Sequence, residues 1–244
     1  MRNEASNDIS CTTTAMSVPV RILIAFIIGV AIAGVALIVP SLLSTDKDAW
    51  WPPSFLTHTL MLLISFLTMV VMSGGRLSGY GFTRGSFHLS ATILLWIIPT
   101  SILSVLQYVA IRSGATTSDL FHLSRVQTII FIWVYASLCE EVFVRGLLQG
   151  YLSLSGTHKV VLIRRWPLSA PVLFGGLFFG AMHVVLWTKM GPLAIVPMIL
   201  ATGLGVVTGY YREKTGSLIP GVLIHGLFNI GGSLPLWILL AWTT

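Results

Sequence analysis

The most informative absence in this sequence is charge. Only 9% of its 244 residues are Asp, Glu, Lys or Arg, whereas soluble globular domains carry about 25%. Apolar residues make up 55% of the chain, and the mean hydropathy is +0.89. A chain with so few charged side chains cannot cover a surface that faces water, which excludes an ordinary soluble domain. The composition instead indicates a polytopic membrane protein.

Cysteine is also scarce, with two residues in the whole chain. Cys11 lies in a polar N-terminal segment and Cys139 inside a long apolar run, so neither a disulfide framework nor a thiolate metal site is indicated. The G-x-S-x-G serine elbow and the H-E-x-x-H zinc helix are missing. The aspartates beyond that N-terminal segment lie between apolar runs, which excludes an aspartyl dyad inside the membrane. They are Asp46, Asp48 and Asp119.

Long apolar runs, in contrast, are abundant. They cover residues 19–43, 54–73, 88–111, 126–152, 168–187, 191–210 and 218–242. Each is long enough to cross a bilayer, since about 20 helical residues span the hydrocarbon core. We therefore expect an all-α fold, a polytopic membrane helical bundle with seven transmembrane helices. The mildly amphipathic segment 116–125 would bring the number of helical segments to eight if it forms an interfacial helix.

The chain is expected to form one membrane domain. Residues 1–17 form a polar cytoplasmic leader, and the apolar run that follows is too long for the core of a signal peptide. No repeat or linker divides residues 18–244, which are expected to form a single transmembrane domain. Glycines recur four residues apart, as Gly176 with Gly180 and Gly205 with Gly209. This spacing lets membrane helices approach one another closely.

The positions of Lys and Arg predict the orientation of the chain. When the loops of the seven-helix arrangement alternate between the two sides, nine basic residues fall on one side and four on the other. Cytoplasmic loops carry such an excess, so we expect a cytoplasmic N-terminus. The expected location is a bacterial inner membrane. Because the basic residues are spread over short loops, nucleic acid is not an expected partner. The nine are Arg2, Arg21, Arg76, Arg84, Lys159, Arg164, Arg165, Arg212 and Lys214, and the four are Lys47, Arg112, Arg125 and Lys189.

Against this apolar background, the run 126–152 contains Glu140, Glu141 and Arg145. Each carboxylate costs roughly 2.5 to 3.5 kcal/mol near the centre of a membrane helix, so the pair indicates a functional site. Glu141 and Arg145 are four residues apart, share one helix face and can form an ion pair. Glu140 points about 100° away from Glu141 and has no partner on its own helix. It therefore needs partners from other helices.

Three polar residues inside other apolar runs can supply those partners. His183 follows Phe179 by one helical turn, and His225 and Asn229 are four residues apart on one helix face. At about 1.5 Å per residue, the depths of Glu140, His183 and His225 differ by little more than two helical turns. The other four histidines lie in loops or at the ends of runs, so we do not expect them at the site. They are His58, His88, His122 and His158.

The combination of one glutamate, two histidines and an asparagine limits the chemistry. It can supply a general base and an oxyanion hole, which are enough for water to attack an amide. One Glu and two His are also a known set of catalytic zinc ligands, which would make Glu140, His183 and His225 the metal site. Asn229 is a poor zinc ligand and a good oxyanion donor, which favours the metal-free alternative. A transporter would be expected to show broken helices in repeated halves, and the sequence does not show them.

Three motifs follow one another on separate apolar runs. They are E-E-x-x-x-R from Glu140 to Arg145, F-x-x-x-H from Phe179 to His183, and H-x-x-x-N from His225 to Asn229. In this order they resemble the CPBP family of intramembrane proteases. That family includes the type II CAAX prenyl endopeptidases and Abi-like bacteriocin-processing and immunity proteins. The resemblance covers about residues 126–232.

The resemblance implies a CAAX-protease-like intramembrane endopeptidase that acts on a membrane-associated protein or peptide. It implies that Glu140 and His183 activate water, and that His225 and Asn229 hold the oxyanion. Glu141 and Arg145 would form a supporting ion pair. A zinc-dependent version of the same protease is one alternative, and a non-catalytic membrane scaffold or immunity protein that retains the fold is another.

Overall fold

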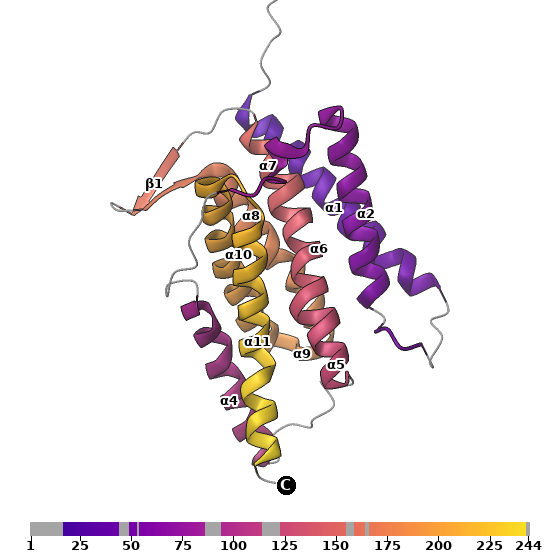
Figure 1. Cartoon of the computed structure of the whole chain (residues 1–244), viewed down its shortest axis with the longest axis vertical. Coiled ribbons are helices and arrows are strands. Elements are labelled where there is room, and N and C mark those ends of the chain that lie inside the picture. Colours follow the sequence, from indigo (N-terminus) through magenta and orange to yellow (C-terminus); the bar gives the residue numbers. More distant parts are fainter. Residues whose placement is uncertain are drawn as a thin grey trace, which may run out of the picture.

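The computed structural model describes residues 17–43, 49–52, 54–85, 94–113, 123–154, 159–163 and 166–242. In these ranges the chain forms a bundle of long helices (Figure 1). Six helices are long and apolar enough to cross a membrane, and a further apolar helix, Ala170–Leu186, is shorter. The expected bundle of seven helices is therefore confirmed. The polar leader before residue 17 and most of segment 116–125 lie outside the described residues.

The helices follow the expected apolar runs. α1 (Val18–Leu42) and α2 (Ser54–Ser73) form the first two spans, and η2 (Leu95–Ile97) continues into α4 (Ile98–Arg112). The fourth span, Arg125–Ser153, comprises α5 (Arg125–Gln127), η4 (Thr128–Ala136), α6 (Ser137–Glu141), η5 (Val142–Leu148) and α7 (Gln149–Ser153). α8 (Ala170–Met182) continues into η6 (His183–Leu186), η7 (Gly191–Ala194) into α10 (Ile195–Thr215), and α11 (Ile219–Ala241) follows. The short elements η1 (Leu77–Tyr80), β1 (Lys159–Ile163), β2 (Trp166–Ser169) and α9 (Trp187–Met190) lie between the spans.

The strands β1 and β2 add a small hairpin that the apolar pattern does not predict. They pair antiparallel, with Lys159 opposite Ser169. Ser169 also begins α8, because its hydroxyl oxygen accepts a hydrogen bond from the backbone N–H of Val172 at 3.3 Å. Pro171 lies in the first turn of α8, where a missing N–H has no cost. The helix therefore begins two residues later than the expected run.

The fourth span lies at the centre of the bundle and packs against α1, α2, α8, α10 and α11. Its start is fixed by a capping box, in which the Ser124 hydroxyl accepts from Gln127 N at 3.2 Å and the Gln127 side chain accepts from Ser124 N at 2.8 Å. Every residue of η5 is buried, including Arg145. Both η4 and η5 have π-helical hydrogen bonding, which occurs frequently at functional sites.

The outside of the bundle is apolar, as expected for a surface that contacts lipid. Val71 is 81% exposed and Leu193 is 68% exposed, although both are large aliphatic side chains. Water would strongly disfavour so much exposed apolar surface, whereas a bilayer does not. The outer surface thus agrees with the membrane-spanning lengths of the helices.

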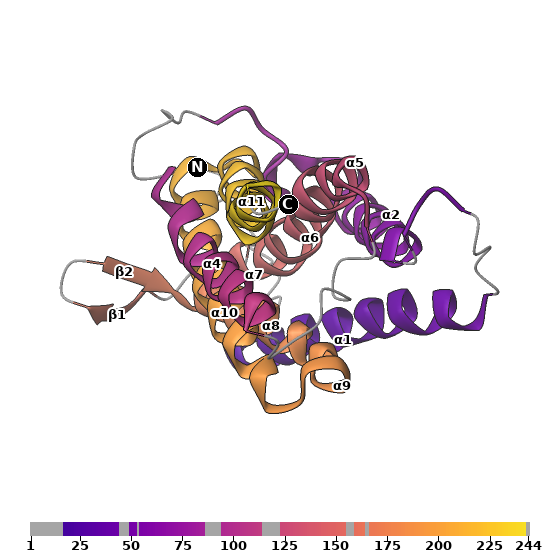
Figure 2. The same cartoon turned by 90° about the horizontal axis from the view of Figure 1, so that it is seen from below.

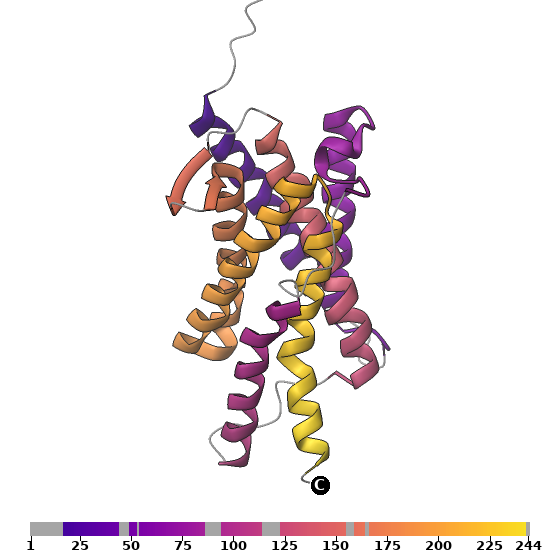
Figure 3. The ribbon, with the colours of Figure 1, turned by 60° about the vertical axis from the view of Figure 1, so that its left-hand side comes forward.

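Glycines allow α8 and α10 to pack closely, and Figure 3 shows these helices side by side. A Cβ atom at Gly176 would lie 2.5 Å from Val206 Cγ2, and one at Gly205 would lie 2.8 Å from Gly176 Cα. Side chains at these positions would therefore force the helices apart, as the glycine spacing predicts. His183 follows α8 directly, so this close contact also determines where His183 lies.

Candidate active site

A cavity of about 960 Å³ lies between α1, α2 and the segment formed by α8 and η6. Figure 2 shows these elements around one side of the bundle, with α1 strongly tilted. The lining is largely apolar and includes Phe26 and Phe178. The titratable side chains among the described lining residues are His58, Glu140 and His183. Glu140 reaches the cavity from the central helix, and its side chain is 16% exposed.

α2 supplies a partner for Glu140. His58 Nε2 lies 3.1 Å from Glu140 Oε1, and His58 Nδ1 lies 2.7 Å from the carbonyl oxygen of Ser54. This geometry corrects the expectation that His58 lies outside the site. Residue 58 is near the start of its apolar run, yet its side chain contacts Glu140, so the start of α2 lies beside the middle of the central helix. The other histidines excluded from the site, His88, His122 and His158, lie outside the described residues.

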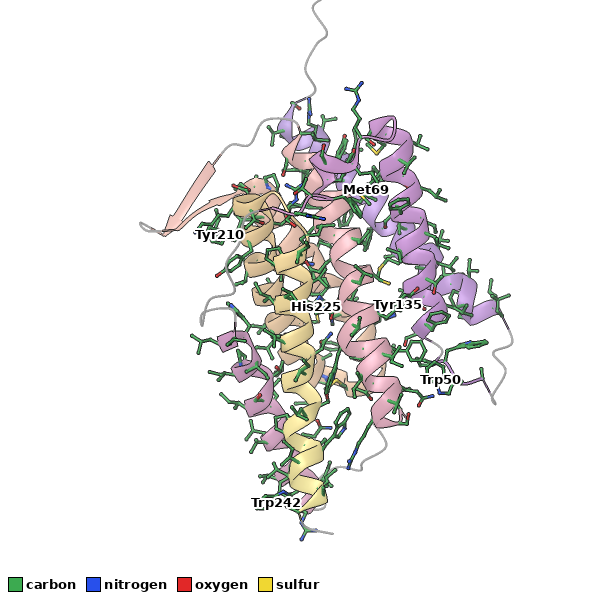
Figure 4. The ribbon with its side chains drawn as sticks, in the orientation of Figure 1. Trp50, Met69, Tyr135, Tyr210, His225 and Trp242 are labelled. Atoms are coloured by element: carbon green, nitrogen blue, oxygen red, sulfur yellow. The ribbon has the colours of Figure 1, made fainter. Side chains whose placement is uncertain are left out.

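His225 approaches the two glutamates from α11, at mid-height of the bundle (Figure 4). Its Nδ1 donates a hydrogen bond to Glu141 Oε1 at 3.0 Å, and its Nε2 lies 3.6 Å from Glu140 Oε2. The whole residue is only 3% exposed. His225 therefore lies between the two neighbouring carboxylates and contacts both.

His183 follows the last residue of α8 and lines the cavity. Its Nδ1 lies 2.9 Å from the carbonyl oxygen of Phe179, one turn earlier. The Phe179 ring makes edge contacts with the His183 ring, at 5.0 Å between centroids, and with the His225 ring, at 5.4 Å. The phenylalanine of the F-x-x-x-H motif thus fixes the orientation of both imidazoles.

The three histidines are oriented in the same way. In each ring Nδ1 faces an oxygen that accepts a hydrogen bond: the carbonyl of Ser54 for His58, the carbonyl of Phe179 for His183, and the carboxylate of Glu141 for His225. Since a carbonyl cannot donate, Nδ1 carries the hydrogen in His58 and His183. Nε2 is then the nitrogen directed to the chemistry of the site. His58 Nε2 and Glu140 Oε1 form a hydrogen bond only when one of these two atoms carries a proton, because an unprotonated ring nitrogen and a carboxylate oxygen can both only accept.

Glu141 lies on an adjacent, fully buried face of the central helix. As the spacing of four residues predicts, its Oε1 lies 3.1 Å from Arg145 Nη1, and both side chains are 0% exposed. The same oxygen accepts the hydrogen bond from His225, so the ion pair also holds a ring of the site. The Arg145 guanidinium lies over the face of Phe179, with Cζ 4.5 Å from the ring centroid.

Asn229 is not placed at the cavity. Its side-chain nitrogen donates to the carbonyl oxygen of Ile132 and to the hydroxyl of Ser137, both at 3.0 Å, which ties α11 to the central helix. The described residues that line the cavity do not include His225 or Asn229. The structure thus brings Glu140, His183 and His225 together and leaves Asn229 one turn further along α11.

The zinc alternative does not fit this arrangement. Among the described residues, no three His, Cys, Asp or Glu side chains are grouped so that they could hold a metal ion. His225 uses one ring nitrogen for Glu141 and directs the other to Glu140. Glu140, His183 and His225 each have a hydrogen-bond partner outside this set, in His58, Phe179 and Glu141, so their arrangement is not that of a set of zinc ligands.

The comparison with protein families agrees with the motifs. Residues 122–231 match the family model described as type II CAAX prenyl endopeptidase, Rce1-like. This range contains Glu140, His183, His225 and Asn229, whereas His58 lies outside it. No curated protein and no solved structure matches the chain. Over this range, which is a little less than half of the chain, the protein is similar to the Rce1-like type II CAAX prenyl endopeptidases, consistent with its resemblance to the CPBP family. The six helices of membrane-spanning length among the described residues indicate an integral membrane protein.

Proposed function

We propose that this protein is an intramembrane endopeptidase that hydrolyses a peptide bond of a membrane-associated protein or peptide. The observation that carries the proposal is the position of Glu140, a carboxylate in the wall of an apolar cavity with His58 and His225 beside it. A charged group in a membrane helix is costly, and it is usually retained for function. The match of residues 122–231 to a protease family supports the same conclusion.

In the proposed reaction Glu140 is the general base. It removes a proton from a water molecule in the cavity while the water oxygen forms a bond to the carbonyl carbon of the substrate. The carbonyl electron pair moves onto oxygen and forms the oxyanion. Glu140 then returns the proton to the amine as the C–N bond breaks. His183 orients the water through Nε2, because its Nδ1 already donates to the carbonyl of Phe179.

The oxyanion is assigned to His225 and Asn229. His225 lies beside Glu140, so Nε2 can donate to the oxyanion once it carries a proton. Asn229 uses its side-chain N–H groups for Ile132 and Ser137 in this structure. Its role in the proposal therefore requires that one of these bonds is exchanged for a bond to the substrate oxygen. The bond to Ser137 is the better candidate, since a hydroxyl can turn to another partner and a helical carbonyl cannot.

The cavity indicates the type of substrate. Its walls come from α1, α2 and α8 and are formed largely by apolar side chains. A hydrophobic peptide segment, or a peptide that carries an apolar anchor, would bury surface there, at roughly 25 cal/mol per Å². A soluble polar peptide would gain little. The proposed substrate is therefore held by the bilayer before it reaches Glu140.

The orientation in the membrane is proposed from the basic residues, with the N-terminus in the cytoplasm of a bacterial cell and its inner membrane as the location. Cysteines introduced at Ser78, after α2, and at Ser113, after α4, lie at opposite ends of the bundle and are both exposed. In a background without Cys11 and Cys139, an impermeant thiol reagent applied to intact cells should label Ser113→Cys and spare Ser78→Cys. The reverse pattern would invert the topology.

The function is tested with purified protein in liposomes that contain a library of membrane-derived peptides. New peptide termini are identified by mass spectrometry, with Glu140→Gln as the inactive control. A farnesylated CAAX peptide and its unmodified twin are added to determine whether an isoprenoid is needed. Cleavage by the natural protein and none by Glu140→Gln is the expected result. Equal products from both proteins, or none from either, would contradict the proposal and favour a scaffold.

A further inference from the structure

We infer that His58 of α2 is a positioning residue for Glu140, a role that rests on the proposed peptidase function. Its Nε2 lies 3.1 Å from Glu140 Oε1, which is the shortest contact from another helix to this carboxylate among the described residues. His58 lies outside the matched range 122–231 and belongs to none of the three sequence motifs. The first part of the chain thus supplies a residue to a site whose motifs lie in the second part.

The His58 ring is itself held in place. Its Nδ1 donates to the carbonyl oxygen of Ser54 at 2.7 Å, which fixes the ring against the preceding turn of α2. The side chain is 14% exposed and lines the same cavity as Glu140 and His183. A side chain with both ring nitrogens engaged cannot rotate without losing a bond. His58 therefore presents Nε2 to Glu140 from a defined direction.

This contact divides the two oxygens of Glu140 between two helices. Oε1 lies beside His58 from α2, and Oε2 lies 3.6 Å from His225 Nε2 from α11. A carboxylate that is held at only one oxygen can turn about its terminal bond, whereas one held from both sides has a fixed plane. Small displacements of such a group can lower the rate of the chemical step by about 10²-fold.

A purely structural role for His58 would be to tie α2 to the central helix. The structure contains a second bond that does this, since Thr59 Oγ1 lies 2.9 Å from the hydroxyl of Tyr135. Figure 4 shows Tyr135 on the side of the central helix that faces α2. Thr59→Val removes one polar bond between the same two helices and leaves Glu140 untouched. It is therefore the matched control for substitutions of His58.

The experiment compares His58→Leu, His58→Gln and Thr59→Val in liposomes, using a peptide that the natural protein cleaves in the membrane-peptide library. Leucine removes the bond to Glu140. The side-chain nitrogen of glutamine can replace Nε2 and still donate to Oε1. We expect His58→Leu to lower kcat roughly 10- to 100-fold with KM changed less than about 3-fold. His58→Gln should recover most of that loss, and Thr59→Val should keep the natural kcat.

A second measurement does not depend on turnover. In protein labelled with ¹⁵N-histidine, the His58 resonances are assigned by their loss in His58→Gln. They should shift when Glu140 is replaced by Gln and stay in place in Thr59→Val. Unchanged His58 resonances in Glu140→Gln would show that the contact does not exist and would overturn the inference.

The outcomes separate this inference from the proposed function. Full activity of His58→Leu, together with an inactive Glu140→Gln, leaves the peptidase in place and removes the role of His58. Equal losses in His58→Leu, His58→Gln and Thr59→Val would show a helix tie and not a positioning residue. A natural protein that cleaves nothing contradicts the proposed function, and the role of His58 is lost with it.

Discussion

Glu140 and Glu141 are neighbours on the central helix, but they lie in different surroundings. On the side toward α2 and the cavity, Glu140 is 16% exposed and has imidazoles beside both oxygens. On the side toward α10 and α11, Glu141 is 0% exposed and its Oε1 is shared by Arg145 and His225. A carboxylate that must exchange protons needs access to water, whereas a fully buried carboxylate that stabilises the fold needs a neighbouring positive charge. The comparison predicts that adjacent, chemically identical residues respond differently to the same substitution.

The largest expected effect is that of Glu140→Gln on turnover. Glutamine keeps the shape and can still contact His58 and His225, but it cannot take a proton from water. We expect kcat to fall roughly 10²- to 10⁴-fold, while the melting temperature stays close to that of the natural protein. Peptide cleavage per folded molecule and thermal unfolding in detergent measure the two quantities. A variant that fails to fold would show that Glu140 is a structural residue.

The next effect is that of Glu141→Gln on stability. This substitution leaves Arg145 as an unpaired, fully buried charge, and breaking a buried ion pair costs about 3 to 5 kcal/mol. Glutamine can still accept the hydrogen bond from His225, so activity per folded molecule should largely persist. Expression level and melting temperature should both fall.

Removal of both charges is the control for that prediction. The double variant Glu141→Gln with Arg145→Met contains no isolated charge, and methionine can fill the space over the Phe179 ring. It should recover much of the stability that the single variant loses. A stable but inactive Glu141→Gln, beside a misfolded Glu140→Gln, would reverse the roles assigned to the two glutamates.

The helices of this fold could be predicted from the sequence because the bilayer imposes their length. The run 54–73 coincides with α2, and the run 218–242 exceeds α11 by one residue at each end. Backbone groups in lipid must bond within their own segment, so an apolar run of that length has few alternatives. The spacing of Glu141 and Arg145 predicted their contact for the same local reason, since a helix alone brings them together.

The neighbours across helices could not be predicted in this way. The position of His58 near the start of its run does not show how far along the central helix α2 begins, or which face α2 presents to it. The H-x-x-x-N spacing places His225 and Asn229 on one face of α11, yet that face meets the carboxylates at one turn and the backbone of Ile132 at the next. The contacts of His58, His225 and Asn229 depend on how segments distant in the sequence pack together. The periodicity of a single helix does not predict that packing.

A third prediction concerns Asn229. It tests whether this residue stabilises the oxyanion or only holds α11 against the central helix. Asn229→Ala should lower kcat about 10²-fold or more if its N–H stabilises the oxyanion. Ser137→Ala removes one of its present acceptors and should leave kcat unchanged or slightly higher, because one N–H becomes available to the substrate. If Asn229 only joins α11 to the central helix, both variants should lower the melting temperature and neither should change kcat per folded molecule.

The smallest expected effect is that of Gly205→Ala. Gly205 is in α10 and packs against Gly176 of α8 and Arg145 of the central helix. A Cβ atom there would lie 2.8 Å from Gly176 Cα and 3.0 Å from Arg145 Nη2, so Gly205→Ala must separate α10 from α8 or displace the guanidinium. Such overpacking costs about 1 to 3 kcal/mol. A Cβ atom at Gly203 of the same helix would have no atom of another described element within 4 Å, so Gly203→Ala is the matched control and should be neutral or slightly stabilising. Because His183 directly follows α8, Gly205→Ala should also lower kcat by a few fold. A loss of stability without any change in kcat would show that His183 is placed independently of the α8–α10 contact.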